Sequence, residues 1–213
     1  MISPKRRGST CFRFAWRNDR DIGDRAMTSA IERALTDAVS VLDNEALRYA
    51  IVGGLAVGAW GVSRSTRDVD LYAELPAGRR RRLEQSLTAK GFEVPAMEEE
   101  LRSFGVFRSR SSSGVFVDIF DAVGPLGEQL LDNRREITVF GRRLWVTAPE
   151  ELFLLKAFSD RERDFEDLVS LASLPRLRIN LAYVHEWAKR LDASIGSTEV
   201  SDRVGRSLRC AKR

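Results

Sequence analysis

The chain has 213 residues, of which 43% are hydrophobic and 31% charged, so it can bury one globular core with a small helical appendage and is not disordered throughout. Its formal net charge of +4 suits a polyanionic partner without requiring one, because much of the excess lies at the two ends. No stretch approaches the roughly 20 apolar residues that span a bilayer, and the N-terminus lacks the apolar centre of a signal peptide. We therefore expect a cytoplasmic protein with no membrane partner.

Cysteine and histidine are too scarce for several classes of chemistry. The two cysteines, Cys11 and Cys210, lie in the expected tails, so neither a disulfide framework nor a zinc site is expected. The single histidine, His185, lies in a late amphipathic helix pattern, where a surface or core imidazole is favoured over a catalytic one. Mechanisms that pair a histidine with a nucleophilic serine or cysteine therefore have almost no material.

The N-terminal segment, residues 1–26, is rich in arginine and has no steady period, which predicts a flexible basic arm. After Met27, apolar residues at helical spacing and a possible N-cap at Thr28 predict a helix over residues 28–44. A start of translation at Met27 is the alternative, in which the arm is an artefact of gene prediction.

Strand and helix patterns then alternate. The run Arg79–Arg82 lies in a helix expected between Pro76 and Gly91, where it forms a solvated face or, alternatively, binds phosphate. A second hairpin is expected to turn at Gly141, between residues 136 and 148. The other strands are expected over 48–52, 67–74, 103–109 and 114–122, the last two forming the first hairpin, and further helices over 54–60 and 125–134.

After Pro149 the sequence has only helical periodicity. A mixed part followed by a helical part predicts an α/β (α+β) fold, with a small mixed β-sheet core and flanking helices. We divide the chain into the arm at 1–26, the α/β core at 27–148, a helical part at 149–192 and a basic tail at 193–213, which is expected to fray from about Asp192.

Two acids stand in an apolar strand pattern, Asp68 and Asp70. Residues two apart in a strand point to the same face, so the carboxylates lie side by side and repel each other. A hard divalent cation such as Mg²⁺, or alternatively Mn²⁺, relieves that repulsion. Asp118 stands in a similar alternating pattern on a strand that could lie beside the first. Three carboxylates on adjacent strands can hold one or two Mg²⁺ ions over a triphosphate, the third activating an attacking hydroxyl; the alternative for each is an edge-strand or turn carboxylate.

The glycine pair Gly53-Gly54 follows a strand pattern and precedes a helical one. Glycine there allows positive φ and leaves backbone N–H groups open to a phosphate, although a pair of glycines alone is often only a turn.

Together, "GG", "SRSTRDVDLY" and "VFVDIFDA" resemble the nucleotidyltransferase fold of the DNA polymerase beta superfamily, and the arginine and threonine before the acids are similar to the bacterial AbiEii-like group, which includes toxins of toxin-antitoxin systems. The resemblance implies that Gly53 and Gly54 embrace nucleotide phosphates. It implies that Asp68 and Asp70 ligate metal and that Asp118 is a third ligand or a base.

The resemblance continues in "APEELFLLKAFSDRERDFEDL", which looks like that group's helical segment. It implies that Lys156 reaches the triphosphate and that Arg161, Asp164 and Asp167 line the cleft. This chain has Gly54 where the family often has serine, and Arg163 where the family often has lysine. Alternatively, Lys156 is an ordinary amphipathic lysine and the R-x-x-D-x-x-D stretch a salt-bridged surface helix.

Other side chains have weaker expectations. Arg64 and Arg67 flank the loop into the acid strand and suit phosphate; Arg67 is equally a structural partner that relieves the acids. Trp60 and Trp145 can stack on a base, but core packing is favoured.

Three functions from different classes follow. The first is Mg²⁺-dependent transfer of a nucleoside monophosphate from a triphosphate, ATP among them, to a hydroxyl of RNA, protein or a small molecule, with an antitoxin as a further partner if the protein is a toxin. The second is a catalytically degenerate domain that binds nucleotide or a partner. The third is a nucleic-acid-binding or antitoxin-like protein that acts through its basic ends, although no recognition helix with its turn is evident.

Overall fold

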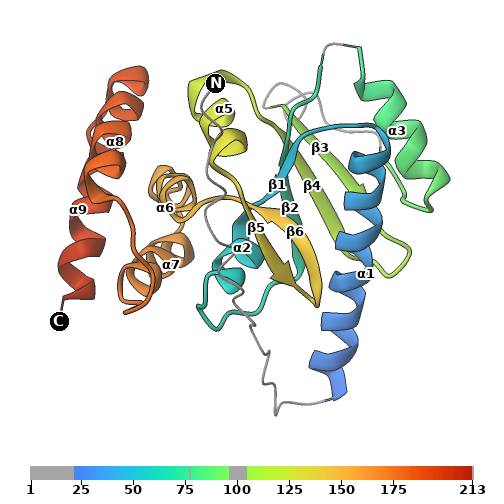
Figure 1. The fold of residues 1–213 in the computed structure, drawn as a ribbon, viewed down its shortest axis with the longest axis horizontal. Coiled ribbons are helices and arrows are strands. Elements are labelled where there is room, and N and C mark those ends of the chain that lie inside the picture. The colour runs from blue at the N-terminus through green and yellow to red at the C-terminus, as the bar shows by residue number, and fades with distance from the viewer. Residues whose placement is uncertain (1–21, 77, 96–104, 213) are drawn as a thin grey trace, which may run out of the picture.

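The computed structural model describes residues 22–76, 78–95 and 105–212, with side chains from residue 27 onward. Helices and strands alternate up to β6, and helices follow it (Figure 1). The helices are α1 (Ile22–Asn44), α2 (Gly53–Ala59), α3 (Arg80–Ala89), α5 (Gly124–Asn133), α6 (Pro149–Phe158), α7 (Glu162–Ala172), α8 (Leu181–Ile195) and α9 (Glu199–Ala211). The strands are β1 (Tyr49–Ile51), β2 (Asp68–Ala73), β3 (Val106–Arg110), β4 (Phe116–Asp121), β5 (Arg135–Val139) and β6 (Arg142–Val146).

Within the described residues the strands form one mixed sheet in the order β3-β4-β2-β1-β6-β5. The pairs β3–β4 and β5–β6 are the two expected hairpins, and β1 and β2 are also antiparallel. The pairs β2–β4 and β1–β6 are parallel, which requires crossovers. The predicted α/β fold with a small mixed sheet is confirmed.

Helices cover the two faces of the sheet because its central strands alternate their side chains. Leu71 of β2 belongs to the large core cluster that also holds the buried residues of α1 and α3. On the other face, Tyr72 packs against a smaller cluster that includes Leu130 and Leu131 of α5. The acids of β2 share this second face with Tyr72, so they lie at the end of the sheet that α5 leaves open.

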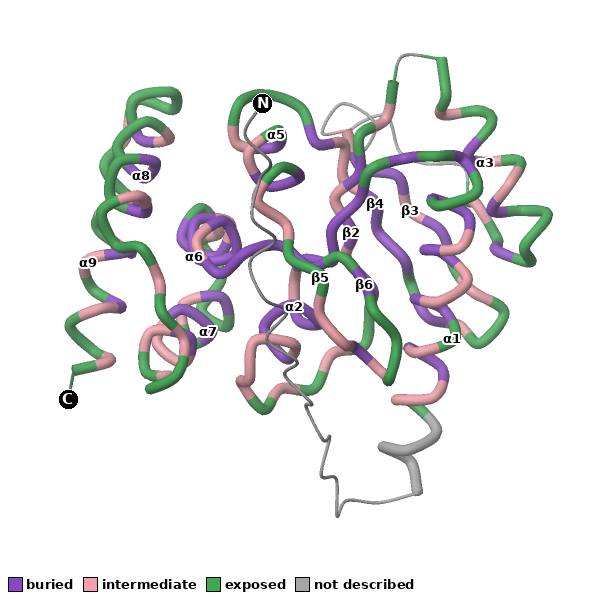
Figure 2. Tube along the Cα trace, in the orientation of Figure 1, coloured by how far each residue is buried: buried purple, intermediate pink, exposed green. Residues whose placement is uncertain are grey.

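The helices α6 to α9 gather beside the sheet, at the left of Figure 1, and α6 is buried along most of its length (Figure 2). Helix α6 contacts α5, α7, α8 and α9, so it joins the sheet to the helical part. None of the described helices combines the length and apolar character that crossing a membrane requires.

The prediction that the chain frays from about Asp192 is wrong, because the chain continues into α9. Both carboxylate oxygens of Asp192 accept backbone N–H groups of the first turn of α9, from Val200 at 2.9 Å and Ser201 at 3.1 Å. Val200 and Val204 are buried in the core cluster. The side chain of Asp192 caps α9 from the preceding helix, and two buried valines one helical turn apart anchor α9 to the core. These contacts stabilise α9 although its overall composition is polar and basic.

At the other end, α1 begins at Ile22, six residues before the expected Thr28. The expected arm thus overlaps the helix at residues 22–26, and residues 1–21 lie outside the described chain. The division into a core at 27–148 and a helical part at 149–192 stays a prediction.

Candidate functional site

The three acids singled out in the sequence lie on two neighbouring strands. Asp68 and Asp70 share one face of β2 by alternation. The parallel register of β2 and β4 places Asp118 directly beside Asp70. Asp118 is buried and Asp68 is exposed, so the carboxylates run from the core to the solvent.

The crowding of the three carboxylates disfavours the charged form of Asp70. Its pKa is raised to about 6, first by burial and then by the negative charges of Asp68 and Asp118. Lys156 and Arg161 act in the opposite direction without cancelling these effects. An incoming cation would therefore stabilise the charged form of this carboxylate.

The glycine turn after β1 presses against the same acids. Gly53 has a φ of 61°, and a Cβ atom there would lie 1.9 Å from Oδ2 of Asp70. A Cβ atom at Gly54 would lie 2.8 Å from Oγ1 of Thr66. That hydroxyl donates a hydrogen bond of 2.7 Å to Oδ1 of Asp68. Both glycines thus let the turn approach the acid strand closely.

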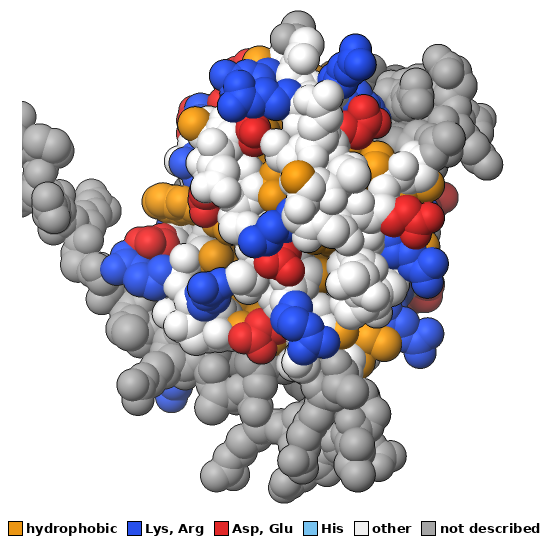
Figure 3. Space-filling model, turned by 90° about the vertical axis from the view of Figure 1, so that its right-hand side faces the viewer, with side chains coloured by type: hydrophobic (Ala, Val, Ile, Leu, Met, Phe, Trp, Pro, Cys, Tyr) orange, Lys and Arg blue, Asp and Glu red, His pale blue; other side chains and the backbone are white. Residues whose placement is uncertain are grey.

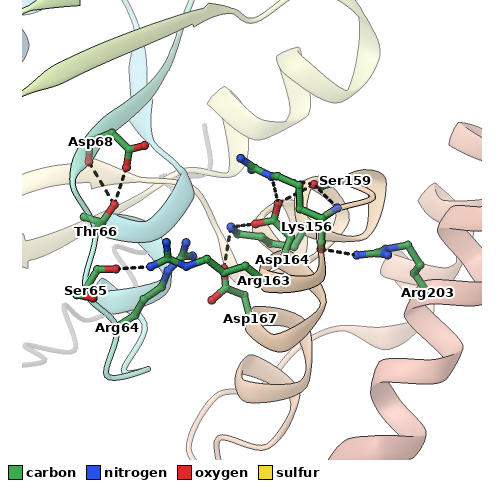
Figure 4. A network of polar contacts seen from close by, with 11 residues as sticks. Arg64, Ser65, Thr66, Asp68, Lys156, Ser159, Arg163, Asp164, Asp167 and Arg203 are labelled. Carbon is green, nitrogen blue, oxygen red and sulfur yellow. Dashed lines mark hydrogen bonds and ion pairs between the residues drawn. The ribbon is translucent and has the colours of Figure 1, made fainter.

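Across from the turn, α6 and α7 form a buried ionic network (Figure 4). The ammonium of Lys156 donates to Oδ1 of Asp164 and lies 2.8 Å from Oδ2 of Asp167. The side chains of Lys156, Asp164 and Asp167 are only 6%, 2% and 7% exposed. Burial alone would raise the pKa of Asp164, but hydrogen bonds from Lys156, Ser159 and Arg161 lower it to about 2.

This network also holds the loop that leads into β2. Arg64 pairs with Oδ2 of Asp167, and Nη2 of Arg163 donates to the backbone oxygen of Ser65 at 2.7 Å (Figure 4). Because Thr66 and Asp68 follow directly, α7 positions the acid strand through its loop.

A cleft of about 110 Å³ opens between the turn, the acids and α6–α7. Its walls combine carboxylates on one side with cationic side chains on the other, an arrangement suited to a metal-bound triphosphate. The lining residues are Gly53, Gly54, Arg64, Asp68, Asp70, Lys156, Arg161, Arg163 and Asp164.

Most of the expected site residues therefore meet at one place. Asp167 lies one layer behind the cleft, where it holds Arg64 and Lys156. Arg67 is exposed and is not among the lining residues. The R-x-x-D-x-x-D stretch is salt-bridged, as one alternative expected, but its aspartates and Lys156 are buried and not on the surface. Their role toward a triphosphate stays a prediction.

Arg108, which donates hydrogen bonds to Asp118, was not among the residues predicted from the sequence. Its Nε and Nη2 atoms donate to the two oxygens of Asp118, each at 2.7 Å. The two residues are register partners on β3 and β4. The available signal was the first hairpin itself, because its register places an arginine opposite the acid. Arg163 and Thr66 belong to motifs recognised in the sequence, but the sequence predicted no contact or function for either residue.

The donor chemistry at this site fits a hard divalent cation in part. No group of three or more metal-binding side chains is placed to hold an ion among the described residues. The fit rests on the pair Asp68 and Asp70 and on the raised pKa of Asp70. Both oxygens of Asp118 already accept from Arg108, and their remaining lone pairs are what Asp118 could offer an ion.

The remaining candidates lie away from the cleft. Trp145, expected in the core, is 36% exposed and lies under the guanidinium of Arg134. Trp60 donates to the backbone oxygen of Thr147 at 2.9 Å, and His185 is exposed, as expected. In the run Arg79–Arg82, the first and last arginines each pair with Glu45. The side of the molecule seen in Figure 3 carries interspersed charges of both signs. This mixed surface favours the solvated face over a phosphate site.

A family model described as "Nucleotidyl transferase of unknown function (DUF2204)" matches residues 31–201. None of the curated proteins matches the sequence significantly. The match confirms the expected nucleotidyltransferase fold, while the narrower likeness to the AbiEii-like group stays a prediction.

Solved structures with a similar fold have low sequence identity. The lincosamide antibiotic adenylyltransferase LnuA, bound to lincomycin, is 16% identical with a TM-score of 0.47, over 64% of this chain and 93% of that chain. An antigenic nucleotidyltransferase-like protein from Paracoccidioides brasiliensis is 18% identical with a TM-score of 0.48, over 85% and 93%. JHP933 from Helicobacter pylori is 14% identical with a TM-score of 0.48, over 87% and 90%.

Proposed function

Because the chain belongs to this family of nucleotidyl transferases, we propose that it transfers a nucleoside monophosphate from a nucleoside triphosphate, ATP among them, to a hydroxyl acceptor. An acceptor oxygen forms a bond to the α-phosphorus, the bond from that phosphorus to the β-phosphate oxygen breaks, and pyrophosphate leaves. The observation that carries the proposal is the cleft in which acids and cationic groups face each other beside a glycine turn.

Each wall of the cleft has a role in this reaction. Gly53 and Gly54 provide backbone close to the acids, where phosphate groups can approach without a side chain in the way. Lys156 and Arg161 place positive charge where charge develops on the phosphate oxygens. Asp164 and Asp167 keep Lys156 in place, so it need not reorganise during the reaction.

Asp68 and Asp70 would hold Mg²⁺, or alternatively Mn²⁺, which would supply charge stabilisation at the reacting phosphate. Asp118 would complete the ligand set or take the proton of the attacking hydroxyl, since a carboxylate beside the acid pair suits either role. Arg108 holds it in position meanwhile.

The first test is calorimetric titration of each nucleoside triphosphate, with and without Mg²⁺, into the wild type and the Asp68→Asn/Asp70→Asn variant. We expect Mg²⁺-dependent binding that disappears in the variant. The Asp43→Asn/Asp132→Asn variant removes the same number of charges from exposed positions outside the cleft and should bind normally. Binding that is equal in all three proteins would contradict the assignment of the acids.

Binding and label transfer measured on the Asp70→Asn and Asp118→Asn variants separate the enzyme from a degenerate binding domain. Such a domain would bind nucleotide or a partner even with Asp70→Asn and Asp118→Asn. An enzyme loses the transfer of label from a labelled triphosphate to RNA, protein or a small acceptor while its fold persists. Asp68, Asp70 and the buried lysine line one cleft, and Asp118 lies beside Asp70 on the next strand, which favours the enzyme.

A toxin of the AbiEii-like group, with an antitoxin partner, is the narrower hypothesis. It is supported by the sequence from Arg64 to Asp70, which resembles that group. Induced expression should then arrest bacterial growth, and Asp70→Asn should relieve the arrest. Normal growth with abundant folded wild-type protein would count against it.

A further inference from the structure

Beside the acids, the open face of the sheet carries an exposed aromatic side chain between two arginines. The strand registers arrange this face in rows that cross β3, β4 and β2. One row holds Arg108, Asp118 and Asp70. The next row, farther from α5, holds Arg110, Phe116 and Asp68.

The exposure of Phe116 is not required by the packing of the strand. Its neighbours Val115 and Val117 point to the other face and are buried at 3% and 0% exposure, whereas Phe116 is 42% exposed. Leaving an aromatic ring in water forfeits hydrophobic stabilisation that a polar residue at this position would not forfeit. An exposed ring next to a reactive site is therefore a candidate contact for a ligand.

Both arginines lie against this ring. The guanidinium carbon of Arg108 is 5.4 Å from the ring centroid and that of Arg110 is 5.6 Å from it. Arg108 is fixed by its two bonds to Asp118, while Arg110 is exposed. Aromatic rings and guanidinium planes are the surfaces on which unpaired bases stack, and a free guanidinium edge binds phosphate.

Phe116 and the two arginines lie across the acids from the cationic wall of the cleft. Gly53, Lys156 and Arg161 line the cleft from the β1 and α6–α7 side, whereas Phe116 and its arginines lie on β4 and β3, across β2. In phosphoryl transfer the attacking and leaving oxygens are roughly in line, on opposite sides of the phosphorus. If the cleft holds the triphosphate, the acceptor hydroxyl approaches from the side of Phe116.

We propose that Phe116, Arg108 and Arg110 form the acceptor subsite and bind the terminal nucleotide of a single-stranded polynucleotide, with its base stacked on Phe116 and its phosphate on Arg110. This inference rests on the proposed function and names its acceptor class. The exposed guanidinium of Arg110 beside the ring favours a phosphate-bearing acceptor over a cationic one, since the charge of Arg108 is already paired with Asp118.

The test measures acceptor binding and triphosphate binding separately. Anisotropy of a short fluorescent single-stranded oligoribonucleotide reports the first, and calorimetry with a triphosphate and Mg²⁺ reports the second. We expect Phe116→Leu, which keeps apolar volume without stacking, and Phe116→Ala to weaken oligonucleotide binding about tenfold. Phe116→Trp should bind at least as tightly as the wild type, and triphosphate binding should not change in any variant.

The chain supplies a matched control in Trp145, an exposed aromatic residue under an arginine on the other half of the sheet. Trp145→Ala should leave both measurements unchanged. Arg110→Gln should reduce the salt dependence of oligonucleotide binding by about 0.7 in the slope of log K against log salt, the effect of one phosphate contact on a single strand.

Several outcomes would overturn the acceptor subsite: no oligonucleotide binding by the wild type, equal binding by Phe116→Leu, or an equal loss in Trp145→Ala. If Mg²⁺-dependent triphosphate binding persists in those cases, the proposed function stands and only the acceptor assignment fails. If triphosphate binding is absent as well, both fail. Unlabelled oligodeoxyribonucleotides and nucleoside monophosphates serve as competitors; competition by either supports the chemistry of the subsite and identifies the form in which the terminal nucleotide arrives.

Discussion

Aspartates line both sides of the cleft, but their electrostatic environments are opposite. On α7, Asp164 is buried against Lys156, Ser159 and Arg161, and its pKa is lowered to about 2 despite its burial. On β2, Asp70 is also mostly buried, but the nearest charges are those of other carboxylates, and its pKa is raised to about 6. The protein therefore neutralises the acids of α7 internally and leaves Asp70 of β2 in need of a cation.

This difference separates structural roles from ligand-binding roles within one site. The acids of α7 hold a lysine and an arginine in place and contribute to the stability of the folded chain. On β2, Asp70 reduces that stability until something positive binds. Functional groups are often held at such a cost, since their environment is arranged for the ligand and not for the free protein.

The largest expected effect is the loss of a neutralised acid. Asp164→Ala leaves the ammonium of Lys156 buried with one partner fewer and should lower the free energy of unfolding by about 3 kcal/mol at neutral pH, measured by denaturant titration. The pKa of Asp164 is lowered, so its stabilising contribution is present above about 3.8 and is lost as the pH falls toward 2. The difference between variant and wild type should shrink over that window. Asp160→Ala, an exposed neighbour, is the control and should change stability by less than about 0.5 kcal/mol.

Asp70→Asn removes a repelled charge, so we expect it to change the free energy of unfolding in the opposite direction. In the presence of a chelator it should raise the free energy of unfolding by about 2 kcal/mol at neutral pH while transfer activity is lost. The pKa of Asp70 in the folded protein lies above the ordinary value of 3.8. Wild-type stability therefore falls as the pH rises from 3.8 to about 6. The gain should therefore appear across this interval and be absent below it. A destabilised variant at neutral pH would show that the carboxylate is neutralised by the protein after all.

The two sides also differed in how far the sequence could predict them. Alternation in a strand was enough to place Asp68 and Asp70 on one face. The pairing of Asp164 and Asp167 with Lys156 depends on the packing of α7 against α6, which helical periodicity alone does not supply. The sequence placed the residues on their elements, whereas packing decided which charges were neutralised.

Arg108 and α9 were missed for physical reasons of a similar kind. A slip of one residue in the register of β3 would turn Arg108 to the other face, so the hairpin signal places Arg108 beside Asp118 only once that register is known. In α9 the burial of Val200 and Val204 outweighs a polar and basic composition, and the cap comes from Asp192 in another helix. Both features depend on contacts between elements.

A smaller effect tests how tightly the glycine turn approaches the repelled acids. Gly53→Ala and Gly141→Ala both place a Cβ atom at positive φ, but only the first meets other atoms, with Oδ2 of Asp70 at 1.9 Å. Gly141→Ala should cost about 1 kcal/mol of stability from backbone strain alone. Gly53→Ala should cost at least about 1 kcal/mol more and should weaken triphosphate binding, which calorimetry would measure. Equal effects would mean that Asp70 moves aside freely and that the turn does not fix its position.

The smallest effect concerns the exposed end of the acid pair. Thr66 donates a hydrogen bond to Oδ1 of Asp68 at 2.7 Å. Thr66→Val keeps the shape of the side chain and removes this donor, and should change stability by only about 0.5 kcal/mol because the pair is in contact with water. Thr66→Ser should behave like the wild type. If the bond orients Asp68 for an ion, triphosphate affinity in Mg²⁺ should fall about two- to fivefold in the valine variant, a change that corresponds to about 0.5–1 kcal/mol. Unchanged affinity would place the working contact at Asp70 and leave Asp68 as a carboxylate whose orientation the ion itself imposes.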